Sequence, residues 1–428
     1  MLINTARDKS RTDRVCYIIE AALEYFIYIL VTGAYLARIT TSLGFSDSLT
    51  GILSSFVSLG CVFQLGSIAL FRRIKHTKRP IMLCDAINQL LFSCVYLTPV
   101  LPLSAAQKTL LFLLCFCSAF ILSNLISPAK VSWLMGMIPD RSRGSFTARK
   151  EIVSLLGGMS FSYLSGSVID HFEAIGNLRM SFIVGSVSIL VLMLLHATTL
   201  FAIREQPVAP VSSSGSLRSL KNNKMYRLIL PVIMCWNIAH YSATPFYGAY
   251  QIKELGFSMT FVSVLSIAYS LVRVAASPLI GRYADKTSFS RMVSLCFSIA
   301  AAGFFINCFT VPENGSVFYT LYYCLSAVSM AGINSALTNL IYDCVRGEGR
   351  RSALAISSSL GGICGFGSTC LMSTVVAYIQ RNGNRLFGLS LYPAQFVSGV
   401  AFILTSCLVI YLCTVVIPTE KKKQADCC

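Results

Sequence analysis

The chain contains the string Gly33-Ala34-Tyr35, followed by Leu43-Gly44-Phe45-Ser46, and it repeats both as Gly248-Ala249-Tyr250 and Leu255-Gly256-Phe257-Ser258. The two copies lie about 212 residues apart in a chain of 428 residues, so each accounts for nearly half of it. Self-similarity at half the chain length indicates a duplicated fold, because small-repeat solenoids repeat at far shorter periods. The sequence therefore predicts two copies of one structural unit.

The composition places both copies in a lipid bilayer. Hydrophobic residues make up 55% of the chain and charged residues only 12%, whereas about a quarter of the residues of a soluble domain are charged. Apolar stretches of roughly 20 residues are long enough to cross the bilayer core as helices. They cover residues 15–36, 49–71, 80–100, 110–135, 152–169, 181–201, 228–250, 260–280, 292–311, 317–342, 353–378 and 394–416. We expect an all-α membrane protein with twelve transmembrane helices in two pseudo-symmetric six-helix bundles.

The distribution of Lys and Arg predicts the orientation of these helices. Positive loops stay on the cytoplasmic side, and most of the 35 basic residues fall in loops that are cytoplasmic if both termini are inside. We therefore expect a multi-pass protein of the plasma membrane with both termini in the cytoplasm. The net charge of +17 is spread over many short loops, which suits anionic headgroups and argues against nucleic-acid binding.

The same pattern predicts the division of the chain. Residues 1–14 form a cytoplasmic tail, 15–203 the first bundle, 204–226 a flexible linker, 227–417 the second bundle and 418–428 a second cytoplasmic tail. The linker region contains two prolines and a serine-rich run, a composition typical of flexible connections. The last tail carries three consecutive lysines and a terminal Cys427-Cys428 pair, which fits either a solvated tail or a lipidated polybasic one.

One loop resembles the signature of a known family. Gly281-Arg-Tyr-Ala-Asp285, followed by Arg291, is similar to the Gly-x-x-x-Asp-(x)n-Arg loop of the major facilitator superfamily. The resemblance implies two six-helix halves and a loop whose acid pairs with a cation in only one gating state. It points to Arg149, Arg350 or Arg351 as partner of Asp285. The equivalent loop of the first half, residues 69–79, has lost its acid and suits lipid headgroups better.

Ionisable residues at membrane depth are functional candidates, because each costs at least a few kcal/mol there. Glu20 and Glu24 lie four residues apart and share a helix face. Lys130 belongs to the fourth span and Asp85 to the third. A charge-compensated cluster of these four would make Glu24 the proton-coupling residue and Lys130 its partner or an anion anchor. The alternative is that Glu20 and Asp85 reach the interface and that Lys130 snorkels to it.

The seventh span, 228–250, is unusually polar and contains a proline. Trp236, Asn237, His240 and Tyr241 are expected to face the central cavity, and Pro245 to interrupt the helix. His240 is either a second proton carrier or a neutral histidine bonded between helices. Further candidates line the cavity or join helices, and they are Tyr28, Asn124 and Asn334.

Other classes of function lack their motifs. The chain has no phosphate-binding loop of an ATP-driven pump and no His-Glu-x-x-His zinc motif, since its four histidines are scattered. We expect a transporter rather than an enzyme, acting as a monomer on a small molecule, with protons as coupling ion and neither cofactor nor metal. Alternating access is the expected mechanism. Proton-antiport efflux of amphipathic compounds and a non-transporting sensor remain the alternatives.

Overall fold

A computed structural model describes residues 2–71, 76–138, 143–205, 223–345, 349–386 and 389–420. Each of the twelve predicted apolar stretches is mainly helical where it is described. Nine of the described helices are long and apolar enough to cross a membrane, and a bent pair makes a tenth if it counts as one span. The all-helical membrane architecture is therefore confirmed, and the predicted total of twelve spans is consistent with it.

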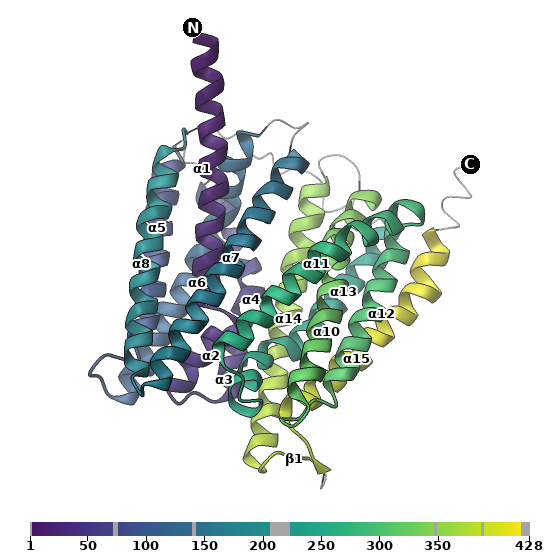
Figure 1. Cartoon of the computed structure of the whole chain (residues 1–428). Helices are drawn as coiled ribbons and strands as arrows, with labels where there is room; N and C mark the ends of the chain where they lie inside the picture. The colour runs from purple at the N-terminus through teal and green to yellow at the C-terminus, as the bar shows by residue number, and fades with distance from the viewer. Residues whose placement is uncertain are drawn as a thin grey trace. The chain divides into compact units, whose positions relative to one another are not determined.

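The chain forms two compact units, and the first consists of residues 1–45, 60–211 and 258–263. In this unit α5 packs against α6 and α8, and α1 packs against α7 and α8 (Figure 1). Its helices are α1 (Leu2–Leu30), α2 (Gly33–Ser42), most of α4 (Phe56–Phe71), α5 (Lys78–Leu97), α6 (Ala105–Gly136), α7 (Arg143–Ala174) and α8 (Leu178–Ala202).

The second unit consists of residues 46–59, 212–257 and 264–428. Here α12 packs against α13 and α15, and α10 packs against α14 and α15. Each of these pairs is the counterpart of a pair in the first unit, about 212 residues later, so the duplication seen in the sequence recurs in the packing. Its helices are α3 (Asp47–Ser54), α10 (Lys224–Ala249), η2 (Tyr250–Glu254), most of α11 (Met259–Lys286), α12 (Phe289–Asn307), α13 (Gly315–Cys344), α14 (Gly349–Arg381), α15 (Pro393–Tyr411) and η3 (Leu412–Val416).

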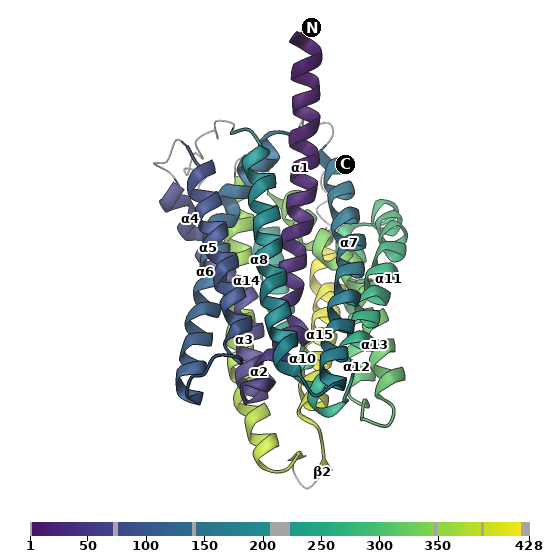
Figure 2. The same cartoon turned by 60° about the vertical axis from the view of Figure 1, so that its left-hand side comes forward.

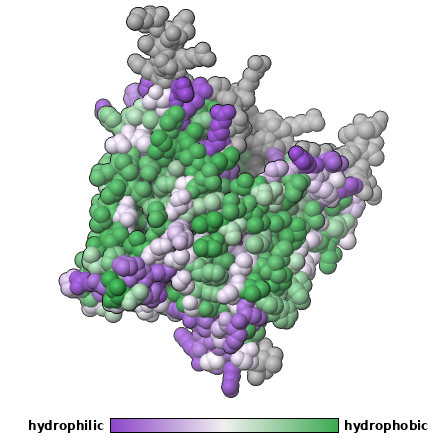
Figure 3. Space-filling view, in the orientation of Figure 1, coloured by the Kyte–Doolittle hydropathy of each residue, from purple (hydrophilic) through white to green (hydrophobic). Residues whose placement is uncertain are grey.

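The surfaces of the helices match a lipid environment. Figure 3 shows hydrophobic residues along the sides of the helices and hydrophilic residues gathered at their ends. Large apolar side chains such as Leu83, Leu194 and Leu371 are more than half exposed. In water such surfaces would be an aggregation liability, whereas in a bilayer they contact acyl chains. A short hairpin, β1 (Arg385–Leu386) with β2 (Leu389–Ser390), lies between α14 and α15 and pairs Arg385 with Ser390.

The first predicted span is not one straight helix, which corrects the expected helix over residues 15–36. It breaks between α1 and α2, with a bend of 40°. Gly33 begins α2 with φ +57, a left-handed conformation that glycine adopts without strain. The carbonyl of Leu30, freed at the break, accepts a 2.7 Å hydrogen bond from the buried Tyr96 hydroxyl. Figure 2 shows α1, α7 and α8 running together on one side of this unit.

Two other spans also differ from their predicted form. The span 49–71 is divided at Ser55 into α3 and α4. By contrast α10 runs without interruption through Pro231 and Pro245, so the expected break at Pro245 is wrong. A proline removes one backbone donor, but here the helix continues past it and becomes the π-helical turn η2.

Each repeated string ends at the start of a helix. Ser46 precedes α3, which belongs to the second unit, and Ser258 precedes α11, whose first residues belong to the first unit. Ser46 caps α3 by accepting a hydrogen bond from the Leu49 amide, and Ser258 accepts one from the Phe261 amide. The start of α11 is held in the first unit by Asp170, whose carboxylate accepts bonds from the amides of residues 259 and 260 at 2.9 and 2.7 Å. Such N-terminal caps favour negative charge.

Candidate buried charge cluster

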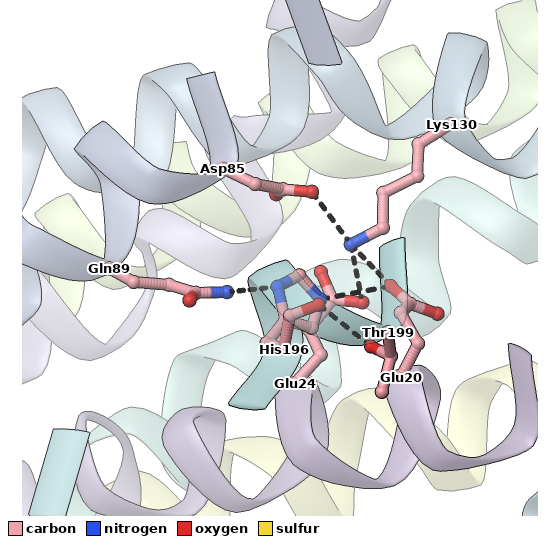
Figure 4. A network of polar contacts seen from close by, with 7 residues as sticks. All are labelled: Glu20, Glu24, Asp85, Gln89, Lys130, His196 and Thr199. Atoms are coloured by element: carbon pink, nitrogen blue, oxygen red, sulfur yellow. Dashed lines mark hydrogen bonds and ion pairs between the residues drawn. The ribbon is translucent and has the colours of Figure 1, made fainter. Parts of the chain in front are cut away.

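Three carboxylates surround one ammonium group inside the first unit. Lys130 Nζ lies 2.7 Å from Glu20 Oε1, 3.1 Å from Glu24 Oε2 and 3.1 Å from Asp85 Oδ2 (Figure 4). The structure thus brings together the four residues that the sequence analysis grouped. With every carboxyl ionised, the acids outnumber the cation, so the cluster has a capacity for additional positive charge.

Helix geometry explains how these side chains meet. Glu20 and Glu24 lie one turn apart on α1 and therefore point to the same side of it. Asp85 comes from α5 and Lys130 from α6, two helices that pack against each other. The three contacts are ion pairs, and at 2.7 Å the one between Lys130 Nζ and Glu20 Oε1 is the shortest. The ammonium is thus held by all three carboxylates at once.

Burial separates the members of the cluster into two groups. The side chains of Glu20, Asp85 and Lys130 are 1%, 3% and 5% exposed, whereas that of Glu24 is 46% exposed. The alternative in which Lys130 snorkels to the interface, with Glu20 and Asp85 reaching it, is therefore wrong. An isolated charge at this depth would be very costly, and the opposite charges offset that cost.

The cluster extends to two residues that the sequence analysis did not select. His196 of α8 is 1% exposed, and its Nε2 lies 3.1 Å from Glu20 Oε1. Its other ring nitrogen, Nδ1, lies 3.0 Å from Nε2 of Gln89, which is a residue of α5. His196 is ionisable and lies inside a predicted span, so the rule that singled out Lys130 applies to it as well, whereas Gln89 is not ionisable.

The same groups include a combination of ligands suitable for a metal ion. Glu20, Glu24 and His196 offer ligand atoms that all lie within 4.8 Å of one another. However, the ammonium of Lys130 already contacts both carboxylates. A metal ion there would be repelled by that like charge, so we assign no metal to this site.

The polar residues predicted on the seventh span belong to the second unit. Trp236 is buried and stacks on Phe297 with a centroid distance of 4.8 Å. Asn237, His240 and Tyr241 are half-buried. The His240 ring contacts the Trp236 ring at 5.4 Å and the Tyr241 ring at 5.2 Å. Trp236 thus belongs to the packed interior, and the other three form a partly accessible polar surface on α10.

The remaining candidates do not join the charge cluster. Asn124 accepts a 3.3 Å hydrogen bond from Gln64 on α4, which favours the joining of helices over a cavity-lining role. Tyr28 is exposed, and its carbonyl accepts a bond from the Thr32 hydroxyl. The side chain of Asn334 lies outside the described residues.

The predicted gating loop is only partly visible. Gly281 and Arg149 are exposed, and Arg291 is half-buried. The side chains of Asp285, Arg350 and Arg351 lie outside the described residues, so the expected pairing across this loop stays a prediction. Most of the predicted linker and of the C-terminal tail also lies outside the described part of the chain.

A comparison with protein families identifies the fold independently. The model of the Major Facilitator Superfamily matches residues 17–369 of the sequence. This chain belongs to the major facilitator superfamily. The family assignment and the apolar helices make it an integral, multi-pass membrane protein of a transporter family. A comparison with curated proteins finds no match.

Solved structures of this superfamily resemble the whole chain. A mutant form of the nucleoside transporter NupG has a TM-score of 0.69 at 14% identity, covering 94% of this chain and 98% of its own. A D-xylose-proton symporter has a TM-score of 0.67 at 12% identity, covering 93% and 96%. A POT family transporter in complex with 5-aminolevulinic acid has a TM-score of 0.66 at 10% identity, covering 94% and 95%. At these identities the likeness shows the fold alone.

Proposed function

We propose that this chain is a proton-coupled secondary transporter that moves a small polar solute by alternating access. The observation that carries the proposal is the cluster around Lys130, in which three carboxylates share one ammonium. Buried ionisable residues in membrane proteins mark ion and proton pathways. A cluster with more acids than bases gains stability by taking up protons, so its charge responds to the proton gradient.

Glu24 is the proposed point of proton exchange. It is the half-buried member of the cluster, and it contacts the buried ammonium of Lys130 at 3.1 Å. Protonation of Glu24 removes one of the three attractions on the ammonium, which then shifts toward Glu20 and Asp85. Such a shift couples to transport only if the two access states differ in their affinity for the proton. We therefore propose that the inward-facing and outward-facing states bind the proton at Glu24 with different affinities.

The proposed solute is small and polar. Asn237, His240 and Tyr241 give α10 a partly exposed surface with hydrogen-bonding groups, which suits hydroxyl, amide or nucleobase groups. Of the structurally similar proteins, one is named a nucleoside transporter and another a D-xylose-proton symporter. These names support the solute class without defining the solute.

Ligand stabilisation followed by transport tests the proposal. The purified protein in detergent is screened for thermal stabilisation by nucleosides, pentoses, amino acids, organic anions and hydrophobic cations. A ligand at about 100 times its dissociation constant adds roughly 2.7 kcal/mol. The hit is then offered to vesicles that contain the protein, with and without an inward proton gradient.

We expect that a polar solute stabilises the protein and accumulates in the vesicles only when the inward proton gradient is imposed. A hydrophobic-cation hit that leaves the vesicles as protons enter would instead establish efflux. A ligand that binds but never crosses the membrane would establish a sensor. Either of these outcomes overturns the proposed uptake.

A further inference from the structure

We infer that His196 and Gln89 form a second proton-binding site beside the cluster, in which the Gln89 amide rotates as the imidazole gains its proton. The inference rests on the proposed function because it assigns this proton to the same coupling cluster. It is carried by a buried chain of contacts that runs from Gln89 through His196 to Glu20 (Figure 4).

The arrangement of donors defines the unprotonated state. The amide nitrogen Nε2 of Gln89 faces His196 Nδ1 at 3.0 Å. An amide nitrogen only donates, so Nδ1 must accept and carries no hydrogen. The imidazole is then neutral, and its Nε2–H donates to Glu20 Oε1 at 3.1 Å.

A second observation points to the protonated state. The amide oxygen Oε1 of Gln89 is buried, and it accepts no hydrogen bond from the part of the chain that the structure describes. A buried acceptor left without a donor is destabilising. If the amide rotates by half a turn, Oε1 takes the place of Nε2 and faces His196 Nδ1. It would then accept a hydrogen bond from a protonated Nδ1.

The two states differ by one proton and one amide rotation. A hydronium ion gives its proton to the Nδ1 lone pair of the neutral imidazole and becomes water, so one O–H bond breaks, one N–H bond forms, and the charge of His196 rises by one. The imidazolium then donates to Gln89 from Nδ1 and to Glu20 from Nε2. In the protonated state the rotated amide oxygen thus gains a donor, which it lacks among the described residues while Gln89 Nε2 faces a neutral Nε2–H imidazole.

The charges around His196 favour that state. Glu20 and Glu24 approach from α1, Asp85 from α5 and Lys130 from α6. The third helix packed on α8 is α7, and its stretch 152–169 contains no charged residue. The surroundings hold three acids and one base, so an added positive charge on His196 is compensated.

Protonation of His196 would change the role of Lys130. Glu20 would then hold a fully charged partner on α8 and depend less on the ammonium at 2.7 Å. The ammonium could move toward Glu24 or Asp85. The charge on His196 would thereby control how strongly Lys130 binds Glu24. With one proton at His196 and one at Glu24, the cluster has a capacity for two protons.

The test is ring-¹⁵N nuclear magnetic resonance of the full chain in detergent, with labelled histidine. The chain has four histidines. The His196 signals are assigned in a variant in which His76, His171 and His240 are replaced by Gln, which avoids changing the site itself. The ring signals are followed between about pH 5 and 8, the range in which histidine charge changes matter.

We expect His196 to be the Nε2–H tautomer at the alkaline end and doubly protonated at the acidic end. Gln89→Met removes the amide, so it should weaken proton binding by His196 about tenfold or more, and Gln89→Glu should strengthen it. Asn88→Leu is the matched control. Asn88 is a buried neighbour on α5, and its replacement should leave the titration unchanged.

Two results would overturn the inference. One is a His196 that stays neutral over the whole range, and the other is a titration that Gln89→Met does not alter. Neither measurement needs a solute, so failure here is separate from failure of the proposed transport. If His196 titrates as expected but Glu24→Gln still accumulates solute, the coupling role of Glu24 fails while the proton site remains.

Discussion

Lys130 is the residue on which the charge cluster depends. It is the cation that faces Glu20, Glu24 and Asp85. Replacement by Met would leave three carboxylates without it, and breaking a buried ion pair from one side costs about 3–5 kcal/mol. We predict that Lys130→Met lowers the unfolding midpoint strongly at pH 8 and less at pH 5, because protonated carboxyls no longer repel one another. Thermal unfolding in detergent at both pH values measures this.

The matched control for this prediction is Lys286→Met. Lys286 is an exposed lysine at the end of α11, and its loss should change stability little at either pH. If Lys130→Met were as stable as the unaltered protein at pH 8, the carboxylates would not depend on the ammonium, and the description of the cluster would be wrong.

The sequence indicated which charged residues belong to this cluster, but it did not indicate every contact that they make. Charged residues inside apolar spans are conspicuous, so Glu20, Glu24 and Lys130 could be found without a structure. His196 is weakly polar when neutral, and a single histidine in a span attracts less attention. Its significance comes from contact with Glu20 across 176 positions of the chain, and no local pattern reveals such a contact.

At the scale of elements, α5 and α8 cap each other at one end. Lys78 Nζ donates to the carbonyls of Phe201 and Ile203, at the end of α8, at 2.8 and 2.6 Å. In return a Glu205 carboxylate oxygen accepts a hydrogen bond from the Lys78 amide, at the start of α5. That amide, together with His76, holds the pKa of Glu205 below its usual range. Each helix end thus satisfies backbone groups of the other.

This mutual cap predicts a pH-dependent effect of Glu205→Gln. Because the pKa of Glu205 is lower in the folded state, its contribution to stability is present above the unfolded pKa and is lost as the pH falls through the folded pKa. Glu205→Gln should therefore lower the unfolding midpoint at pH 7 and have no effect in strong acid. Glu313→Gln, at an exposed loop position, is the control. A loss that is equal at all pH values would exclude the charge as the cause.

The break between α1 and α2 gives another prediction at this scale. The Tyr96 hydroxyl donates to the Leu30 carbonyl at 2.7 Å, and both residues are buried. Tyr96→Phe would leave that carbonyl unsatisfied, at a cost of about 1–3 kcal/mol. Chemical denaturation in mixed micelles measures the loss, with Tyr163→Phe as control because Tyr163 is exposed. An unchanged stability would mean that the break does not need this bond.

The elements themselves were largely predictable, whereas their interruptions were not. Apolar stretches of about 20 residues fix where helices occur in a membrane, because no other open structure satisfies the backbone there. The breaks at residues 31–32 and at Ser55 lie inside such stretches. Conversely Pro245 suggested a break that α10 does not have. At Gly33 the break agrees with a local preference, because glycine adopts a positive φ without strain, whereas at Pro245 the helix continues against the local preference.

At the scale of the whole molecule, the duplication seen in two short strings is repeated by the packing of both units. The pairs α5–α8 and α12–α15 correspond, as do α1–α7 and α10–α14. The charge cluster does not follow this symmetry, because about 212 residues after Glu24, Asp85 and Lys130 the chain carries Trp236, Phe297 and Tyr342. Lys130 and the three carboxylates around it therefore belong to the first unit, whereas the buried Asp47 of the second unit pairs with Lys253.

The central claim is that proton exchange at Glu24 drives solute accumulation. The most direct test compares the unaltered protein with Glu24→Gln in vesicles, using the solute found by thermal stabilisation. Counterflow, which exchanges labelled for unlabelled solute without a gradient, is measured beside accumulation driven by a proton gradient. Glu313→Gln serves as the control for a carboxylate outside the cluster. We predict that Glu24→Gln retains counterflow and loses gradient-driven accumulation. Accumulation equal to that of the unaltered protein would contradict the claim.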